Sequence, residues 1–382
     1  MKLKKYKLAD IAKTEISGID KKTIEGEKPV RLCNFVDVYY NWAITKDKAK
    51  RFMIASAKQS EIDRFSINKG MVAITKDSET KYDIGVATYI ADNFDNIVLG
   101  YHCALITPNP TIVDGKYLNA FMHTQYIQKY FENNASGSGQ RYTLSNDTIS
   151  NIPVLLPSME VQHTIGKLLA DLDRKIELNR QINDNLEAMA KQLYDYWFVQ
   201  FDFPNEEGKP YKSSGGAMVW NEKLKREIPE GWHCGTLLDI AEYTNGLACQ
   251  KYRPTDNNKL PVIKIKEMHD GLSADTEWVK ADIPDGVKVF DGDVLFSWSA
   301  SLEVMLWAYG NGGLNQHIFK VTSKNGYPRS FYFYQLIHYV GVFKQMAEAR
   351  KTTMGHITQD HLRQSTIALP PNVDITLSLI HI

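Results

Sequence analysis

A polar segment at residues 133–145, with the sequence NNASGSGQRYTLS, combines small residues with side chains that can form paired hydrogen bonds. Small residues such as Ser136 and Ser138 let the backbone approach a phosphate closely. Gln140 and Arg141 can each make bidentate contacts with the edge of a nucleobase, and Tyr142 follows them directly. The segment is therefore a candidate for nucleic-acid contact, and an ordinary solvated loop is the alternative.

A second segment of the same kind occupies residues 349–358, with the sequence ARKTTMGHIT. Its polar and basic candidates are Arg350, Lys351, Thr352, Thr353 and His356. Both segments precede related stretches, because LSNDTISNIPVLLP from Leu144 is similar to ITQDHLRQSTIALP from Ile357. A polar and basic segment at the same place in two related stretches is the best internal indication of a binding surface.

Two further polar groups lie beside strand-like runs in the second half of the chain. The run DVLF is followed by the loop SWSAS, which holds Ser297, Trp298, Ser299 and Ser301. Asn315 and Gln316 carry groups that can read bases, and His317 follows them. His317 matches His102 of the first half, so both histidines are equally well interpreted as structural residues with satisfied hydrogen bonds.

The sequence shows no catalytic constellation. It contains no G-x-x-x-x-G-K-[ST] phosphate loop, no Asn-Pro-Pro-aromatic motif, no nucleophile elbow and no HExxH. Its four cysteines form no CxxC and no zinc-like cluster with histidine, and they indicate reduced thiols in a cytoplasmic protein. No apolar run reaches membrane-spanning length. We expect no catalytic residue, no metal site and no membrane contact.

A very long amphipathic helix separates the two halves and must position these groups. It is predicted from Ser158 to Phe198, a rod of roughly 60 Å at about 1.5 Å per residue. Its apolar residues recur in heptads, which predicts a coiled-coil seam, and Asn179 would fix the register of that seam. The predicted seam consists of Ile165, Leu168, Leu172, Ile176, Asn179, Ile182, Leu186, Met189, Leu193 and Tyr196.

Four blocks of sequence recur in the same order in the two halves, which indicates tandem duplicated domains. Besides the stretches named above, KLADIA at residue 7 matches TLLDIA at residue 236. NKGMVAI at residue 68 matches FDGDVLF at residue 290, and YHCALIT at residue 101 matches QHIFKVT at residue 316. Each copy mixes strand-like and helical runs. The formal net charge is +0, although residues 1–157 alone lean basic.

The text from Pro153 to Pro204 resembles the central conserved region of the specificity subunits of type I restriction-modification systems. The residues that carry this resemblance are LP-S-x-E-x-Q from residue 156, KIELNRQINDNLE, YDYWFVQFDFP and the linker FPNEEGKPYKSSGGAMVW with EIPEGW. The SWSAS loop also resembles a recurrent motif of that family. The resemblance covers nearly the whole chain.

This resemblance implies an α+β protein with two tandem mixed α/β target-recognition domains joined by a long coiled-coil-type helix. The expected segments are 1–157 for the first domain, 158–202 for the helix, 203–232 for a linker, 233–371 for the second domain and 372–382 for a tail. It implies a non-catalytic subunit that reads a bipartite site in double-stranded DNA. Methylation (M) and restriction (R) subunits would be its partners, and they would hold S-adenosylmethionine, ATP and Mg.

The tail departs from the family pattern. A second long helix is expected after the second domain, so we interpret residues 372–382 as a truncation. We hypothesise that the last six residues, LSLIHI, are non-native, because a common sequencing-adapter end encodes them. Without that helix the seam would be exposed, and we expect the chain to self-associate through it. A silent specificity cassette, truncated and without activity of its own, is the alternative function.

Overall fold

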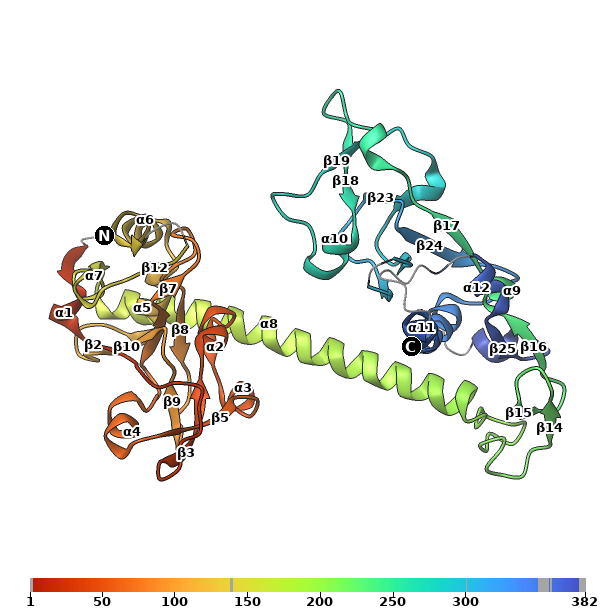
Figure 1. Ribbon diagram of the computed structural model, residues 1–382, viewed down its shortest axis with the longest axis horizontal. Helices are drawn as coiled ribbons and strands as arrows, with labels where there is room; N and C mark the ends of the chain where they lie inside the picture. The colour runs from red at the N-terminus through yellow and green to blue at the C-terminus, as the bar shows by residue number, and fades with distance from the viewer. Residues whose placement is uncertain (1–2, 138–139, 300, 350–356, 358, 378–382) are drawn as a thin grey trace. The chain divides into compact units, whose positions relative to one another are not determined.

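The computed structural model describes residues 3–137, 140–299, 301–349, 357 and 359–377. The chain divides into two compact units, Met1–Asn183 and Asp184–Ile382, called here the first and the second unit. Each unit mixes helices and strands, and the long helix α8 (Met159–Tyr194) spans the boundary between them (Figure 1). The predicted α+β class, with two mixed domains and one long helix, is confirmed.

The first unit is built around a five-stranded sheet of order β2-β10-β6-β8-β4. Every residue of the central strands β6 and β8 is buried, and helices α2 and α5 both pack on these strands. A three-stranded sheet β5-β3-β9 and a small sheet β11-β12-β7 complete the unit, and β1 pairs with β13. The strands of the main sheet are β2 (Ala12–Ile16), β4 (Ala43–Ile44), β6 (Val72–Thr75), β8 (Ala87–Ile90) and β10 (Cys103–Pro108).

The remaining elements of the first unit are short. Its other strands are β1 (Lys4–Lys7), β3 (Lys28–Cys33), β5 (Met53–Ala57), β7 (Asp77–Ser78), β9 (Ile97–Leu99), β11 (Ser136–Gly137), β12 (Tyr142–Thr143) and β13 (Pro153–Leu156). Its helices are α1 (Leu8–Ile11), α2 (Phe35–Tyr39), α3 (Lys46–Ala49), α4 (Gln59–Phe65), α5 (Gly115–Met122), α6 (Gln125–Asn134) and α7 (Asn146–Ser150).

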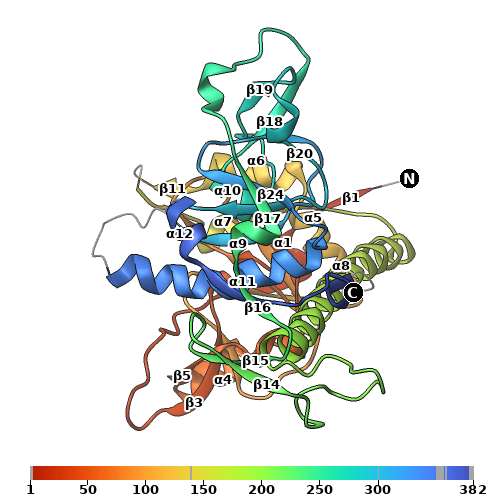
Figure 2. The same ribbon diagram turned by 90° about the vertical axis from the view of Figure 1, so that its right-hand side faces the viewer.

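The second unit has a four-stranded sheet of order β17-β24-β21-β22. Helix α11 packs against α9 and against strands β22 and β24. Figure 2 shows α11 close to α9. The main strands are β17 (Ala241–Asn245), β21 (Val294–Ser297), β22 (Glu303–Leu306) and β24 (Ile318–Ser323). A second four-stranded sheet contains β18 (Lys259–Ile263), β19 (Trp278–Lys280), β20 (Lys288–Val289) and β23 (Gly312–Leu314). The helices are α9 (Leu237–Ile240), α10 (Ile265–Asp270), α11 (Arg329–Ala349), α12 (Gln359–Gln364) and α13 (Asp374–Leu377), with short 3-10 turns at Cys249–Lys251 and Asp285–Val287.

The two units repeat the same topology, which confirms the internal duplication. In each, a strand, a four-residue helix and a sheet strand follow one another, as β1-α1-β2 in the first unit and β16 (His233–Thr236)-α9-β17 in the second. The strand that begins each of these motifs, β1 or β16, then pairs with the last strand of its unit, β13 or β25 (Thr366–Leu369). Leu144 N donates to Lys76 O at 2.7 Å, and Ile357 N donates to Trp298 O at 3.0 Å. These equivalent bonds place the two matched stretches at the same point of the fold.

Helix α8 contains 36 residues and ends in a π-helical turn, Asp195–Val199. Its first turns pack on the first unit, where Gln162 is buried and Ile165 is partly buried against the core. Its last turns belong to the core of the second unit, where the Tyr194 ring stacks on Tyr334 at 5.5 Å and Phe198 meets Phe331 at 5.0 Å. The helix is therefore an integral part of both units.

The residues of the predicted seam lie on a different face of α8 from the one that enters the second core. Leu168, Leu172 and Ile182 are 59%, 48% and 45% exposed, and Asn179 is exposed as well. The same holds for Ile176, Leu186, Met189 and Tyr196, whereas Ile165 and Leu193 are intermediate. Ile165 packs against the core of the first unit, whereas the stripe from Leu168 to Met189 stays exposed among the described residues, so the seam stays a prediction.

The segment expected as a linker, residues 203–232, carries regular structure and part of the second core. It contains the hairpin of β14 (Met218–Asn221) and β15 (Arg226–Pro229). Phe203 stacks on Tyr211 and on Trp232, with ring centroids 4.8 Å and 5.3 Å apart. The unit boundary assigns residues 159–183 of α8 to the first unit and residues 184–194 to the second, and the five segments predicted from the sequence remain a prediction. Within the described ranges, no helix combines the length and the apolar character needed to span a membrane.

Candidate nucleic-acid interface

Within the polar segment at residues 133–145, strands β11 and β12 pair as an antiparallel hairpin, and β12 lies beside the end of a buried strand. Strand β12 pairs with β7, so that Thr143 faces Asp77, and β7 follows directly after β6. Strand β10 pairs with β6, with Cys103 opposite Thr75, and His102 directly precedes β10. The fold thus brings together side chains from three separate parts of the sequence, near residues 77, 102 and 141.

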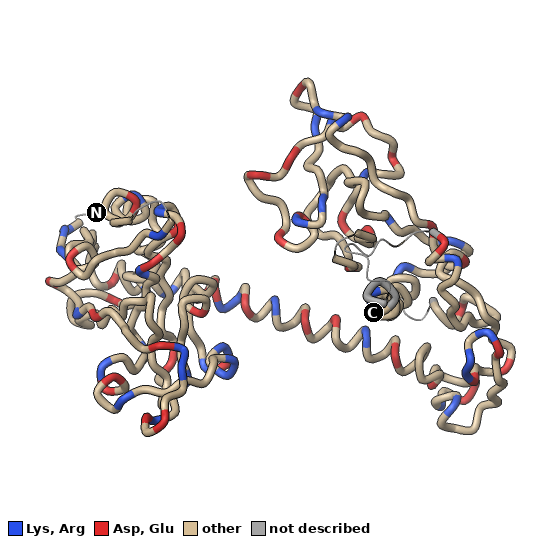
Figure 3. The backbone as a smooth tube through the Cα atoms, viewed as in Figure 1, with Lys and Arg blue, Asp and Glu red and all other residues tan. Residues whose placement is uncertain are grey.

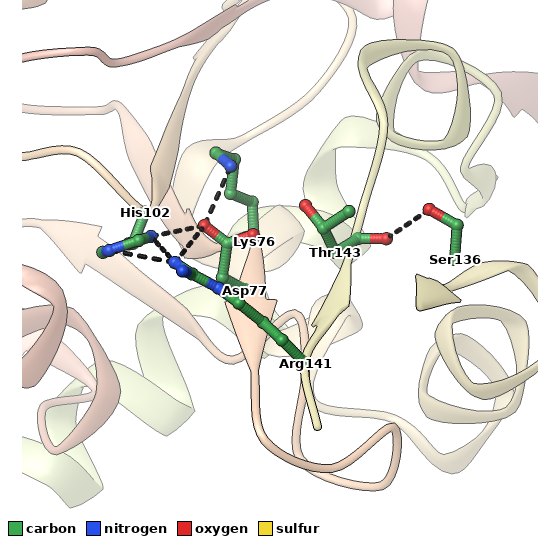
Figure 4. Close-up of polar contacts among 6 residues, drawn as sticks. All are labelled: Lys76, Asp77, His102, Ser136, Arg141 and Thr143. Carbon is green, nitrogen blue, oxygen red and sulfur yellow. Dashed lines mark hydrogen bonds and ion pairs between the residues drawn. The ribbon is translucent and has the colours of Figure 1, made fainter. Parts of the chain in front are cut away.

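Asp77 is the centre of this cluster (Figure 4). Its carboxylate lies 2.5 Å from the Nδ1 atom of His102, 2.8 Å from the Nζ atom of Lys76 and 3.6 Å from the Nη2 atom of Arg141. Burial by itself would raise the pKa of Asp77, but hydrogen bonds from Lys76, Thr143 and His102 outweigh burial and lower the pKa to about 2. Asp77 therefore carries its charge throughout the physiological pH range and can anchor cations.

The His102 ring contacts both Asp77 and Arg141. Its Nδ1 atom lies 2.5 Å from the Asp77 carboxylate, and the Nη2 atom of Arg141 lies 2.6 Å from Nδ1 and 3.1 Å from Nε2. The backbone of His102 has a φ of 71°, a left-handed conformation that residues other than glycine rarely adopt. The surrounding structure must hold this conformation, as is common at functional sites.

Two surface hollows adjoin the cluster and share three of its side chains. The first, called here the basic hollow, has a volume of about 680 Å³ and is lined by Ile16, Ser17, Gly18, Lys76, Asp77, Tyr101, His102, Ser136, Gly137, Arg141 and Thr143. The second, the aromatic hollow, has a volume of about 550 Å³ and is lined by Phe35, Val36, Tyr39, Tyr40, Asp77, Ser78, Glu79, Thr80, Asp83, His102, Gln140 and Arg141. Asp77, His102 and Arg141 form the ridge between them.

The candidates predicted in the first unit lie around this ridge. Gln140 and Arg141 are exposed, and Tyr142 is half-buried in β12. The Ser136 hydroxyl donates to the backbone oxygen of Thr143 at 3.3 Å, so it holds the hairpin together. Ser138 lies outside the described residues. The structure therefore brings the two long polar candidates to the rim of a hollow.

In the second unit, the loop after β21 occupies the equivalent place. The Trp298 indole N–H donates to Asn245 Oδ1 at 3.0 Å, and its ring centroid lies 5.7 Å from that of His317. Ser297 is buried, and its hydroxyl donates to the backbone oxygen of Ser301. The Ser297 side chain therefore stabilises the loop in which it lies.

The other candidates of the second unit are spread around that loop. Ser299 is buried, whereas Ser301 is exposed, with its hydroxyl 3.5 Å from His269 Nε2. Asn315 is buried and accepts from the His317 backbone N–H at 3.4 Å, and Gln316 Nε2 lies 3.3 Å from the His317 ring. The candidates Arg350, Lys351, Thr352, Thr353 and His356 lie outside the described residues.

Sequence reasoning missed Lys76 and Asp77, which anchor the cluster. The repeat itself could have revealed them. Thr75 pairs with the first residue of β10, and Ser297 pairs with the first residue of β24, so Lys76 and Asp77 stand where the SWSAS loop has Trp298 and the next serine. The loop singled out in the second copy thus pointed to its counterpart in the first.

Charge is mixed over both units. Lys and Arg are interspersed with Asp and Glu along the chain (Figure 3). No group of three or more His, Cys, Asp and Glu side chains suited to a metal ion occurs in the part of the chain that the structure describes. The local arrangement of charges, rather than a large field of one sign, must therefore decide what each hollow accepts.

Comparison with known proteins agrees with this architecture. Residues 2–188 and 229–375 match the family model described as Type I restriction modification DNA specificity domain, and the chain belongs to this family. It is 30% identical over 169 residues to the Type I restriction enzyme MjaIX specificity subunit of Methanocaldococcus jannaschii, a match that covers 44% of this chain and 36% of the relative. It is 34% identical over 126 residues to the Type I restriction enzyme HindI specificity subunit of Haemophilus influenzae, covering 33% of this chain and 28% of the relative.

These matches span about a third of the length of the curated relatives, 36% and 28%. A solved structure shares the fold over a longer range. The crystal structure of the Type-I restriction-modification system S subunit from M. genitalium matches with a TM-score of 0.58 and 12% identity, over 99% of this chain and 87% of that chain. The comparisons do not favour the alternative of a silent cassette.

Proposed function

We propose that this chain, as a member of the type I specificity family, binds double-stranded DNA and supplies the sequence specificity of a restriction-modification complex. The observation that supports this most directly is the duplication. In each unit, a loop with polar or aromatic side chains follows an interior strand of the main sheet at the same point of the topology. It follows β6 in the first unit and β21 in the second. Two related domains in one chain suit a target with two separate half-sites.

The first unit offers the chemistry that such a contact requires. Lys76 and Arg141 line the basic hollow, and cationic side chains there can neutralise phosphates. Gln140 and Arg141 are exposed on the rim of the other hollow, and both side chains can form two hydrogen bonds with a base edge. Phosphate contacts would set the register on the duplex, and base contacts would read the sequence.

We assign no bond-making step to this chain. A methylation (M) subunit that uses S-adenosylmethionine and a restriction (R) subunit that uses ATP and Mg are the partners that would carry out the chemistry. Helix α8, at about 1.5 Å per residue, would set the number of unspecified base pairs between the two half-sites. Its packing into the cores of both units supports this proposal, because a spacer that sets a distance must be fixed at both ends.

Methylome sequencing tests the proposal directly. The chain is expressed with its methylation partner in a host without other DNA methylation, and methylated positions are mapped by single-molecule sequencing. We expect one bipartite methylated motif that disappears when this chain is omitted. Methylation that is unchanged without the chain, or that follows no motif, would contradict the proposal.

A further inference from the structure

Arg141 stands on the ridge between two hollows that carry opposite net charge. The charged side chains of the basic hollow are Lys76, Asp77 and Arg141, so their balance is positive. The charged side chains of the aromatic hollow are Asp77, Glu79, Asp83 and Arg141, so its balance is negative. A phosphate is favoured in the first hollow and repelled from the second.

The aromatic hollow has the surface character that suits the edges of base pairs. Val36 in α2 and Tyr40 directly after α2 are 53% and 77% exposed, and such apolar surface can contact a thymine methyl group. The wall behind them is fixed, because the Tyr39 hydroxyl donates to Asp83 Oδ2 at 3.2 Å and Ser78 hydrogen-bonds the other oxygen of Asp83. Exposed apolar groups next to acceptors and an arginine match the mixed pattern of a base edge and not that of a phosphate.

The Arg141 guanidinium contacts two neighbouring side chains through one of its nitrogens, and its other N–H donors remain for a ligand. Its contacts with His102 and Asp77 involve Nη2, and its side chain remains 60% exposed. A guanidinium carries five N–H donors in a rigid fork, so donors remain for a ligand in the aromatic hollow. Asp77 and His102 therefore restrict the rotamers of Arg141 before any ligand arrives, which lowers the entropy lost on binding.

We propose that Arg141 reads a guanine of the half-site recognised by the first unit, and that Asp77 and His102 are positioning residues that orient its guanidinium. This inference rests on the proposed function in DNA recognition. Arginine paired with the O6 and N7 acceptors of guanine is the commonest specific contact in the major groove. The acidic balance of the aromatic hollow disfavours a phosphate there, which leaves a base edge as the partner of the free donors of Arg141, and the basic hollow on the other side of the ridge receives a phosphate.

The test uses the wild-type complex first, so that folding of a variant is not in question. Once the methylated motif is known, each guanine in it is replaced in turn by 7-deazaguanine, which lacks the N7 acceptor, and the affinity is measured by fluorescence anisotropy. We expect roughly a 5- to 150-fold loss at one guanine of one half-site. No loss at any guanine would overturn the assignment of Arg141, while the bipartite motif itself would still support the proposed function.

Variants then assign that guanine to Arg141. Arg141→Ala removes every donor, so we expect it to bind normal and 7-deazaguanine duplexes equally and to relax the methylated motif at that position only. Asp77→Asn is expected to relax the same position more weakly. Arg51→Ala, at an exposed arginine of the same unit, is the matched control and should leave the motif unchanged.

Two outcomes of the variant experiment would refute the inference. If Arg141→Ala still discriminates against 7-deazaguanine, another residue reads the guanine. If Arg141→Ala weakens binding to all sequences equally and reduces the dependence on salt by about one unit of slope, Arg141 contacts a phosphate. A wild-type complex that prefers no sequence at all would instead contradict the proposed function.

Discussion

Replacing Gln162 with alanine should loosen helix α8 from the first unit. The Gln162 amide is 1% exposed and fills a site where three backbone groups need a partner. Its Nε2 atom donates to Ile112 O at 3.2 Å and to Pro157 O at 3.1 Å, and its Oε1 atom accepts from Asp114 N at 3.0 Å. Three net hydrogen bonds of about 1 kcal/mol each give an expected loss of about 3 kcal/mol. Alanine favours helix more than glutamine does, so helix propensity cannot explain a loss.

Hydrogen exchange of the full chain, followed by mass spectrometry, measures this loss where it occurs. Amides in residues 159–166 should exchange about 100-fold faster in Gln162→Ala, the factor that corresponds to about 3 kcal/mol. Gln181→Ala is the control on the same helix, because Gln181 is exposed and contacts Glu177 at 3.3 Å; we expect a change below about 0.5 kcal/mol. If Gln162→Ala altered exchange no more than Gln181→Ala, the idea that α8 is anchored by this amide would be wrong.

Three further outcomes are expected. Gly166→Ala should lower the melting temperature of the first unit, because the added Cβ would lie 2.8 Å from a carboxylate oxygen. Gly341→Ala has no atom within 4 Å of its Cβ and should stabilise the second unit by up to about 1 kcal/mol. Equal shifts of the same sign in calorimetry would contradict this pair of expectations. The pKa of Asp77 is lowered from 3.8 to about 2 in the folded chain, so its ionised form contributes stability above about pH 4 that is lost as the pH falls toward 2. The free energies of urea unfolding of wild type and Asp77→Asn should therefore converge in that range, and a constant difference between them would contradict this role of Asp77. The exposed stripe on α8 should cause self-association that Leu172→Glu with Ile182→Glu abolishes, and a monodisperse wild-type monomer in analytical ultracentrifugation would disprove the seam.

The sequence predicted the architecture well where the signal was local or repeated. The long helix followed from its heptads, and the duplication followed from short blocks in the same order. The equivalent bonds made by Leu144 and Ile357 show why that comparison worked, since the matched stretches hold the same place in two copies of one topology. Gln140 and Arg141 were predicted as candidates from the small residues around two long polar side chains; the structure places them at the rim of a hollow, and their contact with DNA stays a prediction.

The Asp77 cluster and the covered face of α8 could not be predicted, because both depend on contacts between distant parts of the chain. Asp77 meets His102 and Arg141 only because β6 pairs with β10 and β7 pairs with β12, and no spacing in the sequence predicts those pairings. The heptads identified one apolar stripe on α8 but could not show that another stripe, with Tyr194 and Phe198, enters the second core. Periodicity reports that a face is apolar, whereas only the fold decides which face is covered.

A helix-length experiment tests the central claim, that two related domains each read one half-site and α8 sets the distance between them. Seven residues are inserted into the exposed stretch 178–189, which lengthens the helix by about 10 Å and nearly preserves its rotational phase. Methylome sequencing should show both half-sites unchanged and the unspecified spacer longer by up to about three base pairs, at about 3.4 Å per base pair. An unchanged spacer, or altered half-site sequences, would contradict the account.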